Sequence, residues 1–532
     1  MKNINFLYAG GDFIMELFHI LSQSAQRFPS RIAATDGTSM LTYRQLADYS
    51  DRLALYLDGK CSKKGNPVLI YGHKSPFMLV CFLACMKAGI PYCPLDVSLP
   101  IQTVKMVLED IQPSLVCALE PFPFPCNSML SLHVFQEITQ KNKIPDCDIR
   151  LMTAYLTPIA KDDVFCIMYA CDSGETVQGV QISLRSLEEH LKSCVIPCLS
   201  ASFEKVPVFL NQAPFSFDLS VTDIYTCLFL QGTLWCISET DMDNPRLLLH
   251  TFAASKGTVL ISTPSFLEMC LVEEAFCAKQ IPSLSCFLLG KEPLSVKTAA
   301  KLKKQFPDAR IFNLYIPAPT ALAVTSTEIT EKLLQNSQIL PSGSIKPGVQ
   351  IEIRSETGTV LKDGDKGEIV ILSHTSPPGY YKNPFHTKKT FFTEKHKTGS
   401  VQGFHTQDRG YLQDGVLFYC GRKDAAIRLS GHPVALDDVE TGLMKLPQVS
   451  RAAVLPHIRE HRVRNLYAYV VCPEKSISDK SYSARLKEDL LSILPEYMIP
   501  KKFIYVNRFP VSQNGKLDLN ALKNMKTGLY RM

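Results

Sequence analysis

Residues 68–96 read Val-Leu-Ile-Tyr-Gly-His-Lys-Ser-Pro-Phe-Met-Leu-Val-Cys-Phe-Leu-Ala-Cys-Met-Lys-Ala-Gly-Ile-Pro-Tyr-Cys-Pro-Leu-Asp. We expect strands at Val68–Tyr71 and Tyr92–Leu95, separated by a helix at Phe77–Lys87. The apolar run inside this helix is about half as long as a membrane span, so it predicts a buried helix. A strand–helix–strand order favours a parallel sheet with helices on both faces, which is an α/β fold.

The same alternation extends in both directions along the chain. Apolar residues recur with a helical period at Met15–Phe28, and a second helix is expected at Arg44–Leu57. Further strands are expected at Val208–Leu210, Thr233–Ile237, Val259–Ile261, Cys286–Leu289 and Ile311–Leu314. The mixed composition of Ser128–Lys143 supports no assignment.

The C-terminal part has a different character. A β-rich subdomain is expected from Gly367–Leu372 and from the strands that flank Asp414-Gly415, a dipeptide typical of tight hairpins. The tail is expected to hold strands at Ala426–Leu429, Val449–Leu455 and Leu466–Val471, and helices at Asp437–Lys445 and Ser481–Leu494. We therefore predict three parts: an N-terminal extension at residues 1–14, a large domain at 15–423 and a small α+β domain at 424–532.

The composition argues against some classes of function. The 532 residues are 46% hydrophobic and 20% charged, with a net charge of +6 spread without a long basic run. This pattern does not suggest nucleic-acid binding, and no apolar run is long enough for a membrane span. Most of the 18 cysteines stand singly in apolar surroundings, which favours reduced thiols and a cytoplasmic location.

One histidine-rich segment matches a metal motif formally. His457-Ile458-Arg459-Glu460-His461 fits the His-x-x-Glu-His pattern of one zinc protease group. It follows a predicted strand amid arginines, with no third ligand in view. We expect a charged turn here and no metal.

The hairpin around Asp414-Gly415 brings two charged residues together. An antiparallel return would place Arg422 beside Asp408, so a carboxylate and a guanidinium would flank one site. Taken on spacing alone, two exposed charges on a surface hairpin are the simpler explanation.

Motifs in this region decide between the two interpretations. Thr406–Tyr411 and Gly421-Arg422-Lys423-Asp424 resemble the domain junction of adenylate-forming enzymes, which include acyl-CoA synthetases, peptide-synthetase adenylation domains and luciferases. From about Met15 onward the chain resembles in particular the bacterial D-alanine–D-alanyl carrier protein ligases. The resemblance implies that Asp408 holds the ATP ribose hydroxyls, that Arg422 lies near the nucleotide and that Asp424 is the hinge. It likewise assigns nucleotide contacts to Ser173, Asn313, Tyr315, Pro317 and Tyr419.

Two further residues have candidate roles in chemistry. Lys516 follows Asn514-Gly515, a tight turn that can present the next side chain, and the family lysine at this place bridges the substrate carboxylate and the α-phosphate. A plain surface lysine is the alternative. Asp218 lies between Phe217 and Leu219, and in amino-acid-activating relatives it holds the α-amino group. Its alternative role is to cap the following helix.

The phosphate-binding loop departs from the family. Residues 169–180 read Tyr-Ala-Cys-Asp-Ser-Gly-Glu-Thr-Val-Gln-Gly-Val, so Asp172 and Glu175 stand at glycine positions and Gln178 replaces a lysine. Glycine-rich loops work by letting backbone N–H groups approach phosphates. One like-charge contact at about 4 Å costs roughly 4 kcal/mol at an effective dielectric of about 20. We expect this loop to hold a triphosphate weakly.

Other departures fall near the predicted metal and substrate sites. The family Asn-Thr-Tyr-Gly-Pro-Thr-Glu is Asn-Leu-Tyr-Ile-Pro-Ala-Pro at 313–319, so Pro319 replaces the glutamate that ligates Mg²⁺ and Ala318 replaces a threonine. Gln407 replaces a glycine beside Asp408. Leu289, before Gly290-Lys291-Glu292, replaces a cysteine that contacts the substrate methyl group in D-alanine ligases.

We therefore predict a divergent ligase that uses ATP, with Mg²⁺ expected from the family. It would adenylate a small amino acid and transfer it to the thiol of a phosphopantetheinylated carrier protein while the small domain rotates about Asp424. The competing hypothesis is a pseudoenzyme that binds nucleotide, adenylate or a carrier partner without efficient adenylation. A CoA ligase is the third alternative, which the amine-binding aspartate Asp218 disfavours.

Overall fold

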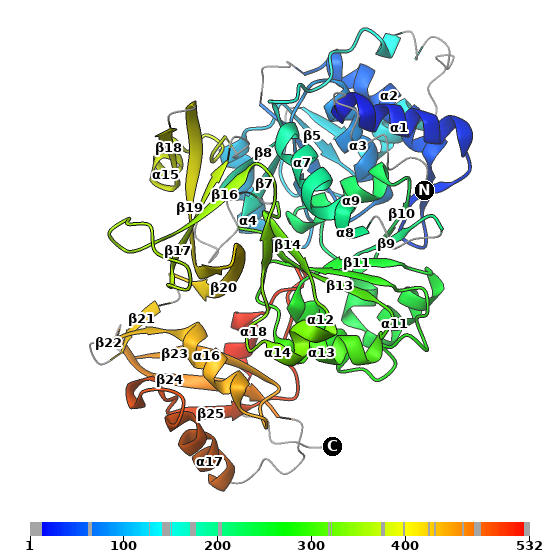
Figure 1. Cartoon of the computed structure of the whole chain (residues 1–532). Coiled ribbons are helices and arrows are strands. Elements are labelled where there is room, and N and C mark those ends of the chain that lie inside the picture. The colour runs from blue at the N-terminus through cyan, green and yellow to red at the C-terminus, as the bar shows by residue number, and fades with distance from the viewer. Residues whose placement is uncertain are drawn as a thin grey trace.

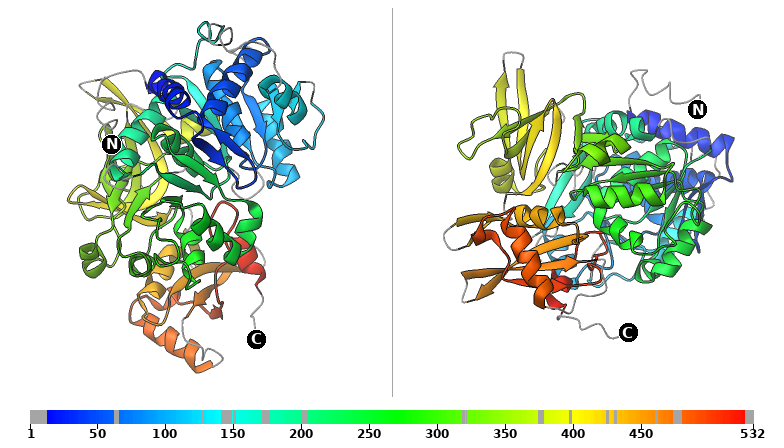
Figure 2. Two further views of the ribbon diagram at one scale, coloured as in Figure 1. Left: turned by 90° about the vertical axis from the view of Figure 1, so that its right-hand side faces the viewer. Right: turned by 60° about the horizontal axis from the view of Figure 1, so that its bottom comes forward.

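The computed structural model describes residues 13–61, 66–126, 128–140, 149, 152–170, 177–199, 205–317, 320, 322–373, 378–396, 399–423, 426–429, 432–459, 462–472 and 480–525. A large α/β part and a separate small C-terminal domain make up the chain (Figure 1). The small domain, coloured orange to red, lies beside the large part in each view of Figures 1 and 2. Across these residues, every helix is too short or too polar to cross a bilayer.

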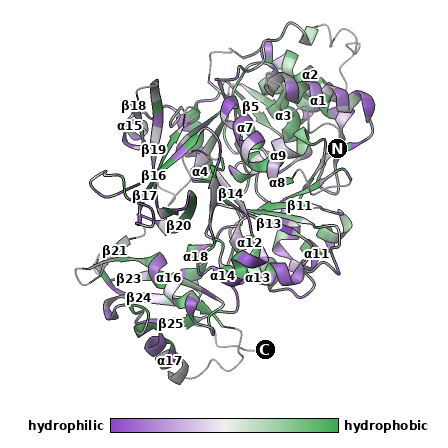
Figure 3. Cartoon of the chain, viewed as in Figure 1, coloured by the Kyte–Doolittle hydropathy of each residue, from purple (hydrophilic) through white to green (hydrophobic). Residues whose placement is uncertain are grey.

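The segment at 68–96 forms the centre of a six-stranded sheet. Strand β3 is Val68–Tyr71, helix α3 is Pro76–Lys87 and strand β4 is Tyr92–Leu95, and β3 pairs in parallel with β4. Ser75 caps α3 through its side chain, and Pro76 takes the first helical position, where no backbone N–H is needed. Almost every residue of α3 is buried, so the helix is apolar all round, as its colour in Figure 3 shows.

The sheet around this unit has the order β6-β5-β3-β4-β7-β8. Its other strands are β5 (Leu115–Ala118), β6 (Met129–Ser131), β7 (Val164–Ala170) and β8 (Gln178–Ser183). The helices nearby are α1 (Phe13–Arg27), α2 (Tyr43–Asp58), α4 (Ile101–Ile111), α5 (Leu132–Gln140) and α7 (Leu184–His190). A π-helical turn at Leu191–Val195 joins α7 to α8 (Ile196–Leu199).

A second sheet carries the parallel strands that build the site. These are β9 (Val208–Asn211), β10 (Thr233–Cys236), β11 (Val259–Ser262), β12 (Cys286–Leu289) and β13 (Arg310–Tyr315). They pair in the order β13-β12-β11-β9-β10, and β1 (Ile32–Thr35) and β2 (Met40–Thr42) extend the edge. Helices α9 (Leu219–Phe229), α10 (Glu239–Asp243), α11 (Pro245–Ala254), α12 (Pro264–Leu271) and α13 (Val296–Gln305) connect and cover them.

Antiparallel strands continue the same sheet into a β-rich subdomain. They are β14 (Thr325–Glu328), β15 (Gly343–Ile345), β16 (Val349–Arg354), β17 (Gly367–Ser373), β18 (Phe391–His396), β19 (Gly399–Gln413) and β20 (Val416–Arg422). Helices α14 (Glu331–Asn336) and α15 (Pro384–Thr390) lie among them. Asp414 and Gly415 both have positive φ, 52° and 74°, as a tight hairpin turn requires.

The small domain has its own apolar core. Strands β23 (Arg451–Arg459), β24 (Arg462–Val471) and β25 (Lys502–Tyr505) form one sheet, and β21 (Ala426–Leu429) pairs with β22 (His432–Ala435). Helices α16 (Leu436–Lys445), α17 (Lys480–Leu491) and α18 (Leu519–Asn524) accompany them, with a short 3₁₀ turn at Glu496–Met498. Buried residues such as Val434, Leu443 and Leu486 pack together within this unit.

The structure confirms the α/β fold class and most expected elements. The strands at 68–71, 92–95, 286–289 and 426–429 have the expected bounds. The strand expected at Val449–Leu455 begins two residues later and continues to Arg459, because it forms a long hairpin with β24. Strands β6, β7 and β8 and helix α5 were not anticipated. Glu460 and His461 of the zinc-like motif lie outside the described residues.

Candidate functional site

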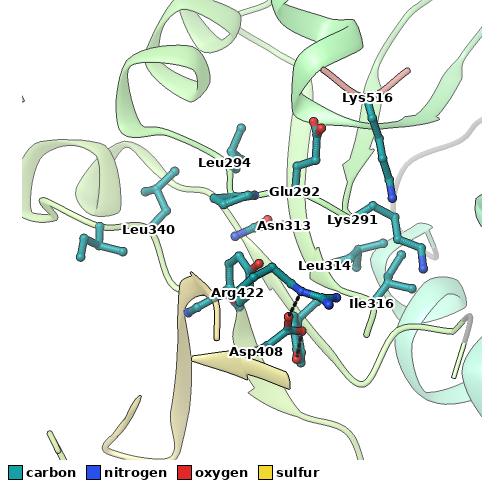
Figure 4. A pocket seen from close by; sticks show the side chains of 15 residues that line it. Lys291, Glu292, Leu294, Asn313, Leu314, Ile316, Leu340, Asp408, Arg422 and Lys516 are labelled. Carbon is teal, nitrogen blue, oxygen red and sulfur yellow. Dashed lines mark hydrogen bonds and ion pairs between the residues drawn. The ribbon is translucent and has the colours of Figure 1, made fainter. Parts of the chain in front are cut away.

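The site lies at the carboxyl ends of the parallel strands. A cavity of about 240 Å³ opens there, as expected for ligand sites in α/β sheets (Figure 4). Residues that follow β12, residues of β13 and its end, two strands of the β-rich subdomain and a loop of the small domain contribute to its wall. The lining residues include Lys291, Glu292, Asn313, Tyr315, Asp408, Tyr419, Arg422 and Lys516.

Tyr315 and Asp408 form one end of the cavity. The Tyr315 hydroxyl donates a hydrogen bond to Asp408 Oδ2 at 2.6 Å, and both residues are buried. Burial and the neighbouring Asp408 carboxylate raise the pKa of Tyr315 well above its usual value, so the phenol stays protonated. Asp408 is also a residue of the cavity wall, where a carboxylate suits a hydroxyl-bearing ligand.

Arg422 lies on the other strand of this hairpin. It pairs in register with Asp408, as the turn at Asp414-Gly415 predicts, and its Nε lies 3.9 Å from Asp408 Oδ1. The Tyr419 ring lies 5.7 Å from the Tyr315 ring, at a tilt of 34°. Two aromatic rings beside a carboxylate and a guanidinium offer stacking and hydrogen bonding to a nucleoside.

The structure explains how glutamine replaces glycine at position 407. Gln407 has a φ of 61°, in the left-handed region that glycine adopts without strain. Its backbone N–H and its side-chain amide both donate to Glu368 Oε1, at 3.3 and 3.1 Å. These bonds offset a conformational cost of about 1 kcal/mol, and Asp408 keeps its position.

Lys516 enters the cavity from a tight turn of the small domain. Gly515 has a φ of 76°, and a side chain there would meet Gln212 and Thr263 of the large part at less than 3 Å. The Thr263 hydroxyl donates to the Gly515 carbonyl, and the Gln212 amide donates to the Gln513 carbonyl at 2.9 Å. These contacts aim Lys516 inward, and its ammonium lies 5.3 Å from the centre of the Phe217 ring.

Further contacts join the small domain to the large part around this turn. Glu292 accepts from the Leu517 N–H at 3.2 Å and from the Ser265 N–H at 3.1 Å. Arg451 Nη1 lies 2.5 Å from Glu268 Oε2, and Arg451 Nη2 donates to Ser265 Oγ at 2.7 Å. The small domain is therefore docked in an orientation that delivers Lys516 to the cavity.

Asp218 lies next to the cavity, but its carboxylate is already paired. Oδ2 accepts a hydrogen bond from the Lys291 ammonium, while Oδ1 is buried without a hydrogen-bond partner among the described residues. Asp218 immediately precedes α9, yet its side chain makes no capping hydrogen bond to the described part of the chain. The helix-cap alternative is therefore wrong, and the carboxylate faces a cation instead.

Lys291 was not anticipated as a site residue. Its side chain is 5% exposed, and its pKa is lowered because burial outweighs the opposing attraction of Asp218. Its φ of 72° is unusual for a residue with a side chain, and such backbone conformations cluster at functional sites. The available signal was its place directly after a buried parallel strand and a glycine, at the edge where ligands bind.

The other predicted residues differ in whether they line the cavity. Asn313 lines the cavity and donates to the Pro341 carbonyl at 2.8 Å. Pro317 accepts from the Thr320 N–H at 3.2 Å and does not contribute to the cavity wall. Gln178, at the sequence position of the family lysine, is hydrogen-bonded to His386 at 2.6 Å. Ser173, Asp172, Glu175, Ala318, Pro319 and Asp424 lie outside the described residues.

Comparison with known proteins agrees with this geometry. The family described as AMP-binding enzyme matches residues 21–381, and its C-terminal domain family matches residues 438–516. The chain belongs to the AMP-binding enzymes. It is 36% identical over 517 residues to a D-alanine–D-alanyl carrier protein ligase of Bacillus licheniformis, covering 96% of this chain and 100% of that protein. A ligase of the same description from Listeria monocytogenes is 35% identical over 494 residues, covering 91% and 94% of the two chains.

Solved structures of other proteins share the fold. Klebsiella oxytoca NpsA in complex with 3-hydroxyanthranilyl-AMSN superposes with a TM-score of 0.79 at 22% identity, covering 96% of this chain and 98% of that one. The anthranilate CoA ligase AuaEII in complex with anthranoyl-AMP gives the same TM-score at 16% identity, with 95% and 96% covered. These similarities support the two-part architecture.

Proposed function

We propose that this chain is an ATP-dependent amino-acid–carrier protein ligase. It adenylates a small amino acid such as D-alanine and transfers the aminoacyl group to the thiol of a phosphopantetheinylated carrier protein. The observation that carries the proposal is that the Lys516 turn is docked into the same cavity as the Tyr315–Asp408 pair. The identity to carrier protein ligases over nearly the whole chain supports the same reaction class.

In the first step a carboxylate oxygen of the amino acid attacks the α-phosphorus of ATP, and the bond to pyrophosphate breaks. Asp408 would hold the ribose hydroxyls, Tyr315 and Tyr419 the adenine, and Arg422 the adjoining oxygens. Lys516 would neutralise the charge that develops where carboxylate and α-phosphate meet, which is the main demand of phosphoryl-centre substitution. In the second step the carrier thiol attacks the acyl carbonyl and AMP leaves.

Two features distinguish this chain within the proposed reaction. Mg²⁺ bound to the triphosphate would stabilise the leaving pyrophosphate, but no group of three or more His, Cys, Asp or Glu suited to a metal is present in the described residues. Pro319 also stands at the place of the family glutamate. We therefore derive no role for a protein-held metal ion. We further propose that the small domain begins at residue 424 and rotates about Asp424 between the two steps.

The test is amino-acid-dependent exchange of labelled pyrophosphate into ATP, with D-alanine, L-alanine and glycine as substrates and Lys516→Ala as the control. The proposal predicts exchange with at least one substrate and its loss in the control. Absence of exchange with every amino acid, together with calorimetric binding of AMP, would overturn it in favour of a nucleotide-binding pseudoenzyme.

A further inference from the structure

We propose that Lys291 is a specificity-determining residue that occupies the amino-group subsite, so that a substrate ammonium must displace the Lys291 ammonium from Asp218. The inference rests on the proposed function, because it assigns Asp218 to the substrate amino group. It adds that a side chain of this protein, Lys291, competes with the substrate amino group for Asp218.

The position of Lys291 relative to the cavity is the first support. Lys291 belongs to the cavity wall, whereas Asp218 is not among the described lining residues, although the two side chains are hydrogen-bonded. The Lys291 ammonium at the cavity wall is therefore already paired with the carboxylate that the substrate amino group would need. Figure 4 shows Lys291 among the side chains that line the cavity.

The second support is the state of the carboxylate. One oxygen of Asp218 accepts from Lys291, and the other is buried with no partner in the described part of the chain. A buried carboxylate oxygen without a donor is costly, which marks this group as built to receive a second donor. That oxygen is out of contact with solvent, and the accessible charge of the carboxylate is paired with Lys291 through the other oxygen.

Charge repulsion decides whether two ammonium groups can share the Asp218 carboxylate or whether one must displace the other. Lys516 already places a second ammonium at the same cavity, over Phe217, the neighbour of Asp218. Adding a substrate ammonium at about 4 Å from Lys291 would cost roughly a thousandfold in affinity at an effective dielectric of about 20. Exchange of one ammonium for the other avoids this repulsion, because the charge at Asp218 stays balanced.

The consequence is a weak preference for the amino group. A substrate ammonium gains its bond to Asp218 only by breaking the Lys291 bond, so the net gain is small. An acid of the same size without an amino group leaves Lys291 in place and loses little. We expect the natural chain to discriminate poorly between these two kinds of acid.

The experiment is calorimetric binding of two non-reactive adenylate mimics, alanyl-sulfamoyl-adenosine and its propionyl counterpart. In the natural chain the two affinities should agree within about threefold. In Lys291→Met, which keeps the length of the side chain and removes its charge, the alanyl mimic should bind at least about tenfold more tightly than the propionyl mimic. Lys301→Met, an exposed lysine of α13, is the matched control and should behave as the natural chain does. Lys291→Arg should keep the poor discrimination.

Two results would overturn the inference. One is a preference of more than tenfold for the alanyl mimic in the natural chain, a measurement that needs no variant to fold. The other is an unchanged ratio in a folded Lys291→Met protein, which would make the ion pair merely structural. If pyrophosphate exchange is absent but the ratio shifts as expected, the proposed function fails and the role of Lys291 stands.

Discussion

The two ends of the cavity use the same kinds of group with opposite results. At the nucleoside end, Asp408 lies on the cavity wall, and its carboxylate is held by the Tyr315 hydroxyl and faces Arg422. At the acyl end, the carboxylate of Asp218 is held by the Lys291 ammonium. One end is preorganised for its ligand, and the other is filled by a side chain of the protein.

The difference shows that the residue type at a motif position does not by itself tell which ligand group that residue can bind. The family aspartate is present at both ends, and the partner of each aspartate decides what the carboxylate can bind. Asp408 is held by a neutral phenol and lies 3.9 Å from a guanidinium nitrogen of Arg422, whereas Asp218 is hydrogen-bonded directly to an ammonium. The predictions below separate the contributions of the two ends and of the turn that lies between them.

The largest effect is expected at Lys516, which serves both ends. Lys516→Ala should lower the rate of pyrophosphate exchange by about 10²–10³-fold, because it removes a preorganised charge from the reacting phosphate. The control is Lys523→Ala, an exposed lysine in the last turn of α18. Equal losses in both variants would show that the effect is general and not a property of the Lys516 position.

A smaller effect, confined to the nucleoside end, is expected at Asp408. Asp408→Asn should raise the KM for ATP by about tenfold to a hundredfold, because the ribose loses a charge-assisted hydrogen bond. The KM for the amino acid should change little. Steady-state kinetics with each substrate varied in turn tests this, and a parallel rise in both KM values would contradict the separation of the two ends.

The contacts that dock the small domain should have a more modest effect. Arg451→Met removes the ion pair with Glu268 and the bond to Ser265, so the orientation that delivers Lys516 becomes less populated. We expect about a tenfold slower adenylation, corresponding to about 1.4 kcal/mol. Transfer of a preformed adenylate to a carrier thiol, measured separately, should be unaffected. Slowing of both steps to the same extent would argue against a role in docking.

The smallest effect concerns the stability of the small domain that carries Lys516. Burial raises the pKa of Glu440 from 4.5 to about 8, with a further contribution from Asp437, while the carboxyl accepts from the Val454 N–H at 2.7 Å. Between these pH values the unfolded chain releases a proton that the folded chain keeps, so the free energy of unfolding falls as pH rises through this window.

Glu440→Gln keeps the acceptor and removes the titration. Its unfolding free energy should exceed that of the natural chain by about 1–3 kcal/mol at pH 8.5, with a smaller difference at pH 4.5. Urea unfolding at the two pH values measures this. A difference that does not grow with pH would show that Glu440 does not titrate in this range.

Local sequence patterns predicted most of the fold. Strands buried on both faces, such as Cys286–Leu289, are continuous apolar runs, so their bounds were predictable. The Asp414-Gly415 turn set the register that places Arg422 beside Asp408. Strands β7 and β8, which flank residues 171–176, were not predicted from the sequence.

The acyl end could not be predicted in the same way. Lys291 and Asp218 are 73 residues apart, and no local pattern links a lysine after β12 to an aspartate before α9. The interdomain contacts of Glu292 and Arg451 are likewise tertiary. Motif resemblance identified Asp218 by type, and the three-dimensional structure was needed to identify its partner.

The most direct test of the account is to mix the protein with ATP and D-alanine in the absence of a carrier and to identify the enzyme-bound products by mass spectrometry. The account predicts up to one alanyl-adenylate per protein molecule with an equal amount of pyrophosphate, and much less in Lys516→Ala. Recovery of ATP and alanine unchanged, from a protein that binds AMP, would contradict the claim that this cavity activates a carboxylate.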